Sequence, residues 1–365
     1  MNVKDLSISW WRTKLDASSL YYLQRCLENE WISQGYVTEE FEAHMAQSLD
    51  VPYAVATTSG SMALLMALMA YGIGEGDEII VPNRTFIATA HAGVLLGARV
   101  VLVDVAQELP LLDISKIKEK ITKKTKAIMP VHLNGRAVCM NELRAIASEY
   151  GLCIIEDCCQ ALFSKYNDRS IGCEADAACF SFGMTKLLAI GQGGLVVTKH
   201  REIYEKLLLL RNHGVNDTFD GTYSQLGFNF KFTDIQASLG LAQLSTIHQK
   251  INNLVKVYAR YVEHLEHLSC IQIIPVNVTW GEVPLYIEAK TPERDKLLSF
   301  LTLHGVQARP FLPDLDQSPH LGNNGSFPNA RSFSREGIYL PGGPERNVEE
   351  IDYVASLLRE YQLNL

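Results

Sequence analysis

The chain has 365 residues, 47% of them hydrophobic, and a formal net charge of −8 at pH 7. This length predicts two domains with a large core, and the negative charge argues against nucleic acid or an anionic membrane as the main partner. No stretch of about 18 uncharged apolar residues exists, so we expect no membrane span. The eight cysteines are scattered and no apolar signal-peptide core is present, so we expect reduced thiols and a cytoplasmic protein.

Short apolar runs alternate with helical patterns over the first two thirds of the chain. Two helical patterns lie within 16–48, the second opening at Thr38 as a capped start. Strands are then expected at 53–57, 78–81, 100–103, 127–131, 152–156, 177–182 and 195–197, and helices at 62–69, 88–96 and 140–150. This alternation is typical of an α/β fold with a mainly parallel sheet between helices.

The later part of the chain has a different pattern. A long helical region is expected over 234–268, and the proline-interrupted remainder indicates a smaller α+β domain. We therefore place a large domain at 1–245 and a small C-terminal domain at 246–365. The lysine-rich run 116–126 is interpreted as the solvated face of a helix.

A turn rich in serine and glycine joins the strand at 53–57 to the helix at 62–69. Its residues Gly60 and Ser61 open the helix, where free backbone amides and the helix dipole suit a phosphate group. An ordinary helix N-cap explains the same residues, so this turn alone leaves both interpretations open.

An acid and a lysine follow two of the expected strands. Asp157 directly follows the run 152–156. Acids at the carboxyl end of a parallel strand often line a ligand crevice, although Asp157 could equally cap a following helix. Lys186 follows the run 177–182 and precedes a glycine-rich turn at 191–194. A lysine that forms a Schiff base and a carboxylate that pairs with a pyridinium nitrogen are what a pyridoxal phosphate (PLP) enzyme needs. Such a lysine must be partly unprotonated, which burial and nearby positive charge promote.

Seven ordered segments of the chain resemble the DegT/DnrJ/EryC1/StrS family of sugar aminotransferases, which have the PLP-dependent transferase fold type I of aspartate aminotransferase. The segments lie at 31–35 with 39–42, 58–64, 81–89, 156–161, 180–186, 211–214 and 227–237. The resemblance implies a mainly parallel seven-stranded sheet and a smaller C-terminal α+β domain.

The resemblance also implies roles for individual residues. Lys186 would carry the cofactor and exchange protons with the substrate, and Asp157 would pair with the pyridinium nitrogen. Phe86 would stack on the cofactor ring. The other implied cofactor contacts are Gly60, Ser61, the backbone at Met62, Gln160 beside the phenolic oxygen, Ser181, and Asn229 on the phosphate of a neighbouring subunit. The last contact implies a homodimer with shared sites.

The implied reaction is transfer of an amino group from glutamate or glutamine to a keto sugar, with PLP cycling through pyridoxamine phosphate (PMP). A nucleotide-linked 4-keto-6-deoxy or 3-keto sugar is the expected acceptor, for an amino sugar of a surface polysaccharide or natural product. Candidate substrate contacts are His91, His213 and Arg309, although a surface salt bridge would also explain Arg309. Gln192 replaces the acid that is frequent in the glycine-rich turn, and no histidine follows the proline at 310.

Three other interpretations remain. The dehydratase branch of the family carries histidine in place of lysine, so Lys186 argues against it. An aminotransferase that acts on a cyclitol or another non-nucleotide ketone fits the same cofactor residues, and so does a non-catalytic PLP-binding regulatory protein. The histidines show no metal-ligand spacing, and Cys158 and Cys159 are expected to be packing thiols. Trp10 and Trp11 could flank a ligand, but we expect them to pack in a core or an interface.

Overall fold

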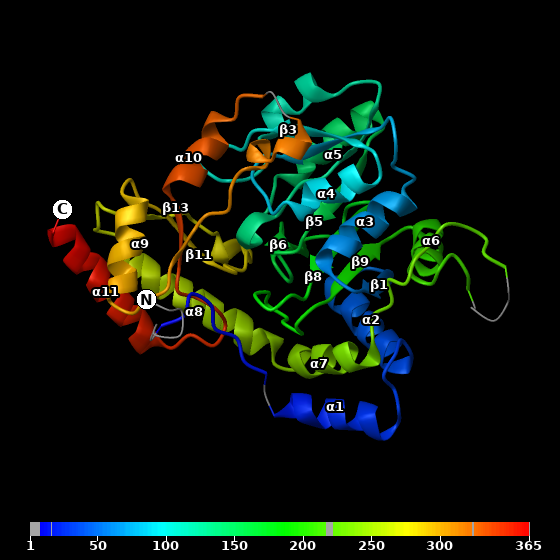
Figure 1. The fold of residues 1–365 in the computed structure, drawn as a ribbon, viewed down its shortest axis with the longest axis horizontal. Coiled ribbons are helices and arrows are strands. Elements are labelled where there is room, and N and C mark those ends of the chain that lie inside the picture. The colour runs from blue at the N-terminus through cyan, green and yellow to red at the C-terminus, as the bar shows by residue number, and fades with distance from the viewer. Residues whose placement is uncertain (1–7, 16, 217–221, 323–324, 365) are drawn as a thin grey trace.

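A computed structural model describes residues 8–15, 17–216, 222–322 and 325–364. It contains a seven-stranded sheet enclosed by helices and a four-stranded antiparallel sheet beside it (Figure 1). The strands of the large sheet are β1 (Tyr53–Thr57), β2 (Glu78–Pro82), β3 (Arg99–Val103), β4 (Thr125–Ile128), β5 (Cys153–Asp157), β8 (Ala177–Ser181) and β9 (Gly194–Thr198). The small sheet consists of β10 (Gln272–Ile273), β11 (Ile287–Lys290), β12 (Arg309–Pro310) and β13 (Gly337–Leu340), and β6 (Lys165–Tyr166) pairs with β7 (Arg169–Ser170).

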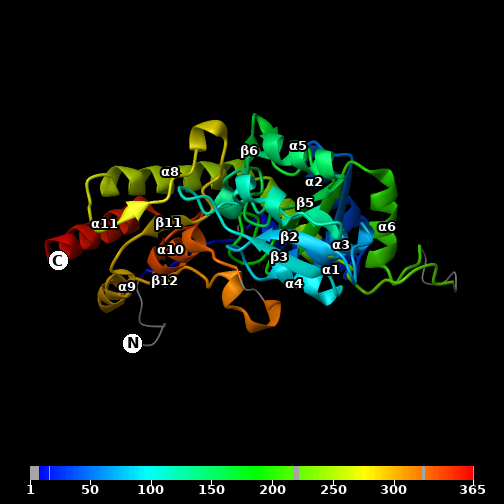
Figure 2. The same cartoon turned by 90° about the horizontal axis from the view of Figure 1, so that it is seen from above.

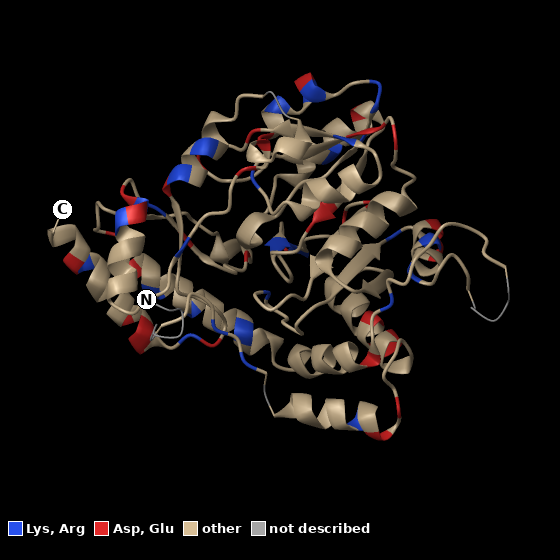
Figure 3. Cartoon of the chain, viewed as in Figure 1, with Lys and Arg blue, Asp and Glu red and all other residues tan. Residues whose placement is uncertain are grey.

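The helices are α1 (Ser18–Glu28), α2 (Tyr36–Leu49), α3 (Gly60–Ala70), α4 (Ala88–Leu95), α5 (Met140–Tyr150), α6 (Arg201–Arg211), α7 (Asp234–Leu244), α8 (Ile247–Leu265), α9 (Arg294–Leu303), α10 (Pro328–Glu336) and α11 (Val348–Leu363). Short 3₁₀ turns lie at η2 (Ile114–Lys116), η3 (Lys118–Lys120), η4 (Leu133–Gly135), η5 (Val278–Trp280), η6 (Leu315–Gln317) and η7 (Pro319–Leu321). None of the helices in the described ranges combines the length and apolarity needed to cross a membrane. Figure 3 shows that both signs of charge are distributed over the peripheral helices.

The large sheet has the strand order β1-β9-β8-β5-β4-β2-β3. Strand β9 pairs antiparallel with both of its neighbours, whereas the other pairs are parallel. The expected mainly parallel seven-stranded sheet and small α+β region are therefore confirmed. Because β1, β2, β4, β5 and β8 point the same way, their carboxyl ends meet at one edge of the sheet.

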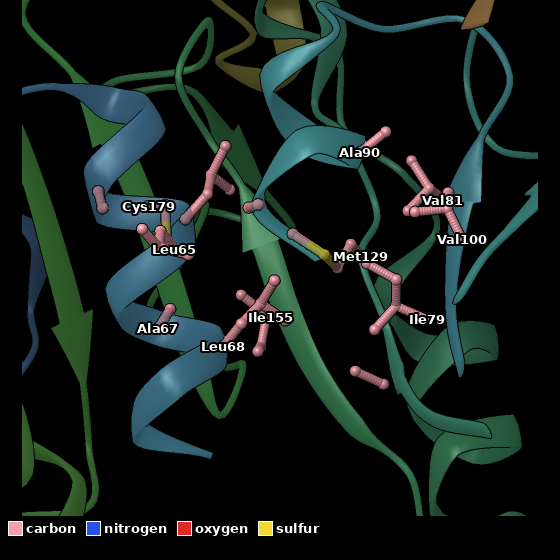
Figure 4. Close-up of a cluster of buried hydrophobic side chains, with 14 of the residues drawn as sticks. Leu65, Ala67, Leu68, Ile79, Val81, Ala90, Val100, Met129, Ile155 and Cys179 are labelled. Carbon is pink, nitrogen blue, oxygen red and sulfur yellow. The ribbon is translucent and has the colours of Figure 1, made fainter. Parts of the chain in front are cut away.

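Both faces of the large sheet are apolar because helices cover each face (Figure 2). In β9, Val196 joins the cluster beneath α3, whereas Leu195 and Val197 join the cluster that includes α2 and α7. Helix α3 packs its apolar residues, among them Leu65 and Leu68, against the strands (Figure 4). Continuous apolar runs of this kind are typical of a sheet that is buried on both sides.

The structure adds to or differs from the sequence-based expectations in three places. The region 234–268 is helical as expected, but it is divided, because α7 ends at Leu244 and α8 begins at Ile247. Helix α6 was not predicted. The lysine-rich run 116–126 is exposed as expected but is not a helix: it forms 3₁₀ turns and then enters β4 at Thr125. Within it Ile117 is the fully buried residue, so the run lacks the apolar stripe that holds a longer helix against a core.

Helix α2 also begins earlier than predicted, at Tyr36, and its cap comes from a distant segment. The carboxylate of Asp234 accepts hydrogen bonds from the backbone amides of Gly35 (2.9 Å), Val37 (3.2 Å) and Thr38 (2.9 Å) and from the Thr38 hydroxyl (2.7 Å). Thr38 therefore does not act as the predicted cap. One carboxylate at the start of α7 satisfies the free amides of α2 and adds favourable charge at its N-terminus.

The small sheet contacts both ends of the chain. Helices α8, α9 and α11 pack on it with Ile8, which forms a parallel bridge to Val306. Trp11 forms a second parallel bridge, to Gly342. Ile8 and Trp11 therefore lie against C-terminal segments of the chain.

Candidate active site

A cavity of about 400 Å³ lies at the edge where the parallel strands of the large sheet end. Its volume falls in the usual range for a small-molecule site. One side, which we call the sheet wall, is formed by Gly60, Ser61, Asp157, Ser181 and Lys186. A second set of lining residues, which we call the aromatic wall, consists of Trp10, Tyr286, Arg309 and Tyr339. Further lining residues include Thr85, Phe86, Cys159, Gln160, Thr185, Gln192 and Leu312.

The start of helix α3 opens into the cavity at the sheet wall. Ser59 caps the helix by accepting a hydrogen bond from the Met62 amide (3.2 Å). The first intrahelical hydrogen bond runs from the Ala63 amide to the Ser59 carbonyl (2.9 Å). The amides of Gly60 and Ser61 come before this first donor, so they are available to an anion. A Cβ atom on Gly60 would lie 2.7 Å from Ser181 Cβ and 2.9 Å from Cys159 Sγ. Glycine is therefore required for this close approach.

Asp157 is the last residue of β5 and is buried, with 4% exposure. Its Oδ2 accepts a hydrogen bond from the Thr89 hydroxyl (2.7 Å), and its Oδ1 accepts one from the Cys159 amide (3.1 Å). The Thr85 hydroxyl lies 2.9 Å from that of Thr89. These bonds fix the plane of a carboxylate at the bottom of the cavity.

Gln160 is oriented by the loop that follows β4. Its Oε1 accepts a hydrogen bond from the Asn134 amide (3.0 Å). Because the oxygen is engaged, the NH₂ group of Gln160 is the end available to a ligand. Asn134 has a left-handed backbone (φ 55°) and is fully buried.

Lys186 follows β8 and lines the cavity, with its amine nitrogen 5.9 Å from the ring centroid of Tyr286 in the aromatic wall. Burial opposes the charged form of its amine, but the Tyr286 phenol, the Cys159 thiol and the Asp157 carboxylate act in the other direction, and together they raise the pKa of Lys186. We expected nearby positive charge to favour the neutral amine. The surroundings instead favour the ammonium form in the absence of a ligand. Burial raises the pKa of Cys159 well above its ordinary value, so this thiol is neutral at pH 7.

The aromatic wall is a packed set of rings with one cation. Trp10 lies 5.8 Å from Tyr286 and 6.1 Å from Tyr339 between ring centroids. The Arg309 guanidinium stacks on Trp10 at 4.5 Å, and none of the ion pairs of the described residues involves Arg309. Trp10 packs against other rings as expected, and it also lines the cavity, which agrees with the alternative that the tryptophans flank a ligand. Phe86 lies across the opening with 52% exposure.

The two walls are joined by contacts between the segment after β2 and the segment after β12. Arg84 pairs with Asp314 at 3.0 Å, and both side chains are buried. Arg84 also stacks on Phe311 at 4.4 Å. Asn83 exchanges hydrogen bonds with Asp316. These contacts hold Arg309 and Leu312 against the loop that carries Thr85 and Phe86.

The structure brings together most of the site residues expected from the sequence. Gly60, Ser61, Phe86, Asp157, Gln160, Ser181, Lys186 and Arg309 line the cavity. Met62, His91, His213 and Asn229 do not. The Met62 amide is held by the cap on α3, and His91 Nε2 lies 2.8 Å from His320 Nε2. His213 and Asn229 are exposed on the segment after α6.

Sequence reasoning missed Thr89, Asn134, Tyr286 and Tyr339. Thr89 lies in the segment 81–89, which resembles the family, and it follows Phe86 by three residues. Residues at this spacing face the same side of a helix, so the position of Phe86 could have indicated Thr89. For Asn134 the signal was weak, a small polar residue before glycine. Tyr286 and Tyr339 belong to the small sheet, and no local pattern marks them as site residues.

A second cluster was not evident from the sequence spacing. His132, Glu156 and Cys158 are buried with their ligand atoms within 4.8 Å of one another. His132 Nε2 lies 2.9 Å from Glu156 Oε2, and His132 Nδ1 accepts a hydrogen bond from the Val138 amide (3.2 Å). The imidazole is thus engaged on both nitrogens, so we interpret the cluster as a support beneath β5.

The architecture is that of PLP-dependent transferases of fold type I. The crystal structure of S. venezuelae DesV in complex with a ketimine intermediate matches with a TM-score of 0.91 and 33% identity, covering 95% of this chain and 94% of that one. The model of the DegT/DnrJ/EryC1/StrS aminotransferase family matches residues 13–359. The chain belongs to this family, which implies PLP as its cofactor.

Two relatives illustrate the range of names in the family. GDP-perosamine synthase of Vibrio cholerae is 31% identical over 355 residues, which cover 95% of this chain and 97% of the relative. The dTDP-3-amino-3,4,6-trideoxy-alpha-D-glucose transaminase of Streptomyces venezuelae is 33% identical over 356 residues, which cover 96% of this chain and 92% of the relative. At similar identity the two names differ in both nucleotide and sugar.

Proposed function

We propose that this chain transfers an amino group from glutamate or glutamine to the ketone of a nucleotide-linked sugar. The observation that carries the proposal is that Lys186 and Asp157 line one cavity, which the N-terminus of α3 also enters. A nucleophile, an acid and an anion-binding helix start are the three elements that a phosphorylated pyridine cofactor needs.

The residues of the cavity fit PLP. The Gly60 and Ser61 amides with the Ser181 hydroxyl would hold its phosphate, where a Cβ on Gly60 would fill the space. Asp157 would hold a proton on the ring nitrogen. The hydrogen bonds that its carboxylate accepts from Thr89 and Cys159 fix the orientation of the carboxylate for this role. Phe86 would cover one ring face, and the NH₂ group of Gln160 would face the phenolic oxygen. When bound, PLP withdraws electrons from the reacting carbon and carries the amino group between donor and acceptor as PMP.

Lys186 would both attach the cofactor and move protons. Its amine would take the proton from the carbon next to the donor nitrogen and return it at the neighbouring position, which is general acid–base chemistry by one side chain. The raised pKa of the free amine favours the form that delivers a proton. The amine must lose that proton before it acts as a nucleophile.

Arg309 would bind an anionic part of a substrate, either the diphosphate of the sugar nucleotide or the carboxylate of the donor. A guanidinium offers two parallel donors to such groups. We propose a 4-keto-6-deoxy or 3-keto sugar as acceptor, for an amino sugar of a surface polysaccharide or a natural product. A coupled amination assay over UDP-, dTDP- and GDP-linked keto sugars, with products identified by mass and NMR, tests this. Absence of any aminated product across the panel would contradict the proposal.

We further propose a homodimer with shared sites. The proposal is supported by the exposed Asn229, which is outside the cavity of one chain, and by the exposed apolar side chains of Tyr223, Leu226 and Phe228 on the same segment. Mixing inactive Lys186→Ala chains with inactive Asn229→Ala chains tests it. In a mixed dimer one site would receive both native residues, so activity should return; no recovery, in chains that light scattering shows to exchange, would contradict shared sites.

Other interpretations lead to different results. A dehydratase would give a deoxy product without nitrogen transfer, and a cyclitol enzyme would ignore nucleotide sugars. A non-catalytic regulatory protein would form no ketoglutarate from glutamate.

We also propose a division into domains 1–245 and 246–365, which the two separate sheets support. A cytoplasmic location is a further proposal, which the eight free cysteines support.

A further inference from the structure

Tyr286 enters the cavity from the residue just before β11 of the small sheet. Its hydroxyl donates a hydrogen bond to the Thr185 carbonyl (3.2 Å) and lies 3.3 Å from the Thr185 hydroxyl. Thr185 immediately precedes Lys186, so the phenol is attached to the backbone that carries the lysine. The ring itself is buried, with 7% exposure.

The same phenol acts on the Lys186 amine. The amine nitrogen lies 5.9 Å from the Tyr286 ring centroid. The Tyr286 phenol, together with Cys159 and Asp157, raises the pKa of the amine against the effect of burial. Tyr286 is the strongest of these three in favouring the charged amine. A side chain that enters from the small sheet thus lies over the amine of a lysine that follows a strand of the large sheet.

Asn134 sets the position of Tyr286. Its Nδ2 donates to the Tyr286 carbonyl (3.0 Å), and its Oδ1 accepts from the Tyr286 amide. Asn134 thus pairs with the backbone of Tyr286 like a short piece of strand, while its own amide holds Gln160. The ring is confined on its other sides by Trp11 at 5.4 Å and Tyr339 at 5.5 Å.

We propose that Tyr286, seated by Asn134, is a positioning residue that holds the Lys186 amine in the cavity whenever the lysine is not bonded to cofactor. This inference rests on the proposed function. A lysine side chain has four rotatable bonds and strongly hydrated charge, so a free ammonium group would otherwise turn toward solvent. Held by the phenol, it stays within reach of the carbon atoms whose proton it moves, which lowers the entropic cost of each transfer.

The test compares the native chain with Tyr286→Phe, which removes the hydroxyl but keeps the ring packed against Trp11 and Tyr339. The full chain without cofactor is treated with an amine-acylating reagent over a range of pH, and labelling of Lys186 is measured by peptide mass spectrometry. Since the phenol raises the pKa of the amine, the labelling midpoint should fall by about one pH unit in the variant. Exposed Lys123 is an internal reference, and its midpoint should not move.

A second variant separates the side chain of Asn134 from its backbone. Asn134→Gly keeps the left-handed conformation without strain and loses both side-chain bonds to Tyr286. In this variant the pH midpoint of Lys186 labelling should also fall, but by less than in Tyr286→Phe. With cofactor added, both variants should keep the visible absorbance of lysine-bound PLP and the KM for substrates, while kcat falls about tenfold or more.

The outcomes distinguish this inference from the proposed function. Coincident midpoints and equal kcat in native and Tyr286→Phe chains would overturn the role of Tyr286 and leave the proposed function intact. If the native chain itself gives no absorbance of lysine-bound PLP, both the proposed function and this inference are overturned. A lower midpoint in Tyr286→Phe, with cofactor absorbance retained, supports both.

Discussion

The sheet wall and the aromatic wall of the cavity are built in different ways. Residues of the sheet wall stand at or next to the ends of strands that the large sheet brings to one edge, so backbone geometry places them. Residues of the aromatic wall come from the N-terminal segment and from three separate parts of the small sheet, and ring packing places them. We propose that the sheet wall serves the cofactor common to the family. In the aromatic wall, Tyr286 would position Lys186, whereas Arg309 and the rings around it would adapt the site to one substrate.

The largest expected effect is on the sheet wall. Lys186→Ala should lower kcat by about 10⁴-fold or more, because it removes both the attachment point and the proton carrier. Steady-state amination assays measure this, and the exposed Lys123→Ala is the matched control that should stay at the native rate. Full turnover in Lys186→Ala would contradict the assignment of the sheet wall.

A second change tests whether the absence of a side chain at Gly60 allows the cofactor phosphate to bind at the start of α3. Gly60→Ala should weaken PLP binding by about tenfold to a hundredfold, because its Cβ would lie 2.7 Å from Ser181 Cβ, and overpacking of this kind costs about 1–3 kcal/mol. Titration with PLP followed by absorbance measures the change. Gly74→Ala is the control, since its Cβ would lie no nearer than 3.7 Å to the Leu96 carbonyl oxygen. Equal PLP affinity in the two variants would show that the helix start is not the phosphate site.

Substitution of Arg309 in the aromatic wall should change the KM of a substrate rather than kcat or PLP binding. Arg309→Gln should raise the KM of an anionic substrate about tenfold, equivalent to about 1.4 kcal/mol, without loss of PLP absorbance. Arg309→Lys should give an intermediate value, because it keeps the charge and loses the planar group that stacks on Trp10 at 4.5 Å. Kinetics with each substrate varied in turn identify which one Arg309 binds. Loss of cofactor from either variant would break the distinction between the walls.

The smallest effect concerns the link between the walls. Burial raises the pKa of Asp314 to about 6, with Arg84 acting in the opposite direction. The folded chain therefore holds this proton more tightly than the unfolded chain, whose ordinary value is 3.8. The protonated Asp314 carboxyl group therefore contributes to the unfolding free energy. This contribution is fully present below about pH 4 and is lost as the pH rises through about 6.

Asp314→Asn cannot titrate at this position. Relative to the variant, the native chain should therefore lose about 1 kcal/mol of unfolding free energy between pH 4 and 6, once solvent screening is allowed for. Urea unfolding of both chains at several pH values measures the difference. Parallel pH dependences would show that Asp314 does not titrate in this range.

The same contrast explains what the sequence could and could not predict. Asp157 and Lys186 follow apolar runs whose ends can be located, and parallel strands bring such ends together, so the sheet wall follows from pattern and family resemblance. The contact of Trp10 with Tyr286 depends on how the N-terminus crosses to the small sheet, and nothing near either residue encodes that. The direction of β9 was equally hidden, because an apolar run has the same composition whichever way it runs.

Other errors have local causes. A helix was expected to start at Thr38 because that residue is a good cap, but a carboxylate from residue 234 takes the capping role. The break at 245–246 within the long helical region was not apparent from the sequence, because it contains serine and threonine rather than glycine or proline. Local propensity could not show either feature.

The cap that Asp234 provides has a consequence for the order in which the chain folds. Strand β1 pairs only with β9 in the large sheet, and α2 depends on a carboxylate about two hundred positions further along. During synthesis, β1 and α2 therefore leave the ribosome before β9 and Asp234, their partners, have been made. Contacts of such long sequence separation form late and slowly. The N-terminal helices should accordingly be among the last parts of the molecule to gain protection in a pulse-labelled hydrogen-exchange experiment.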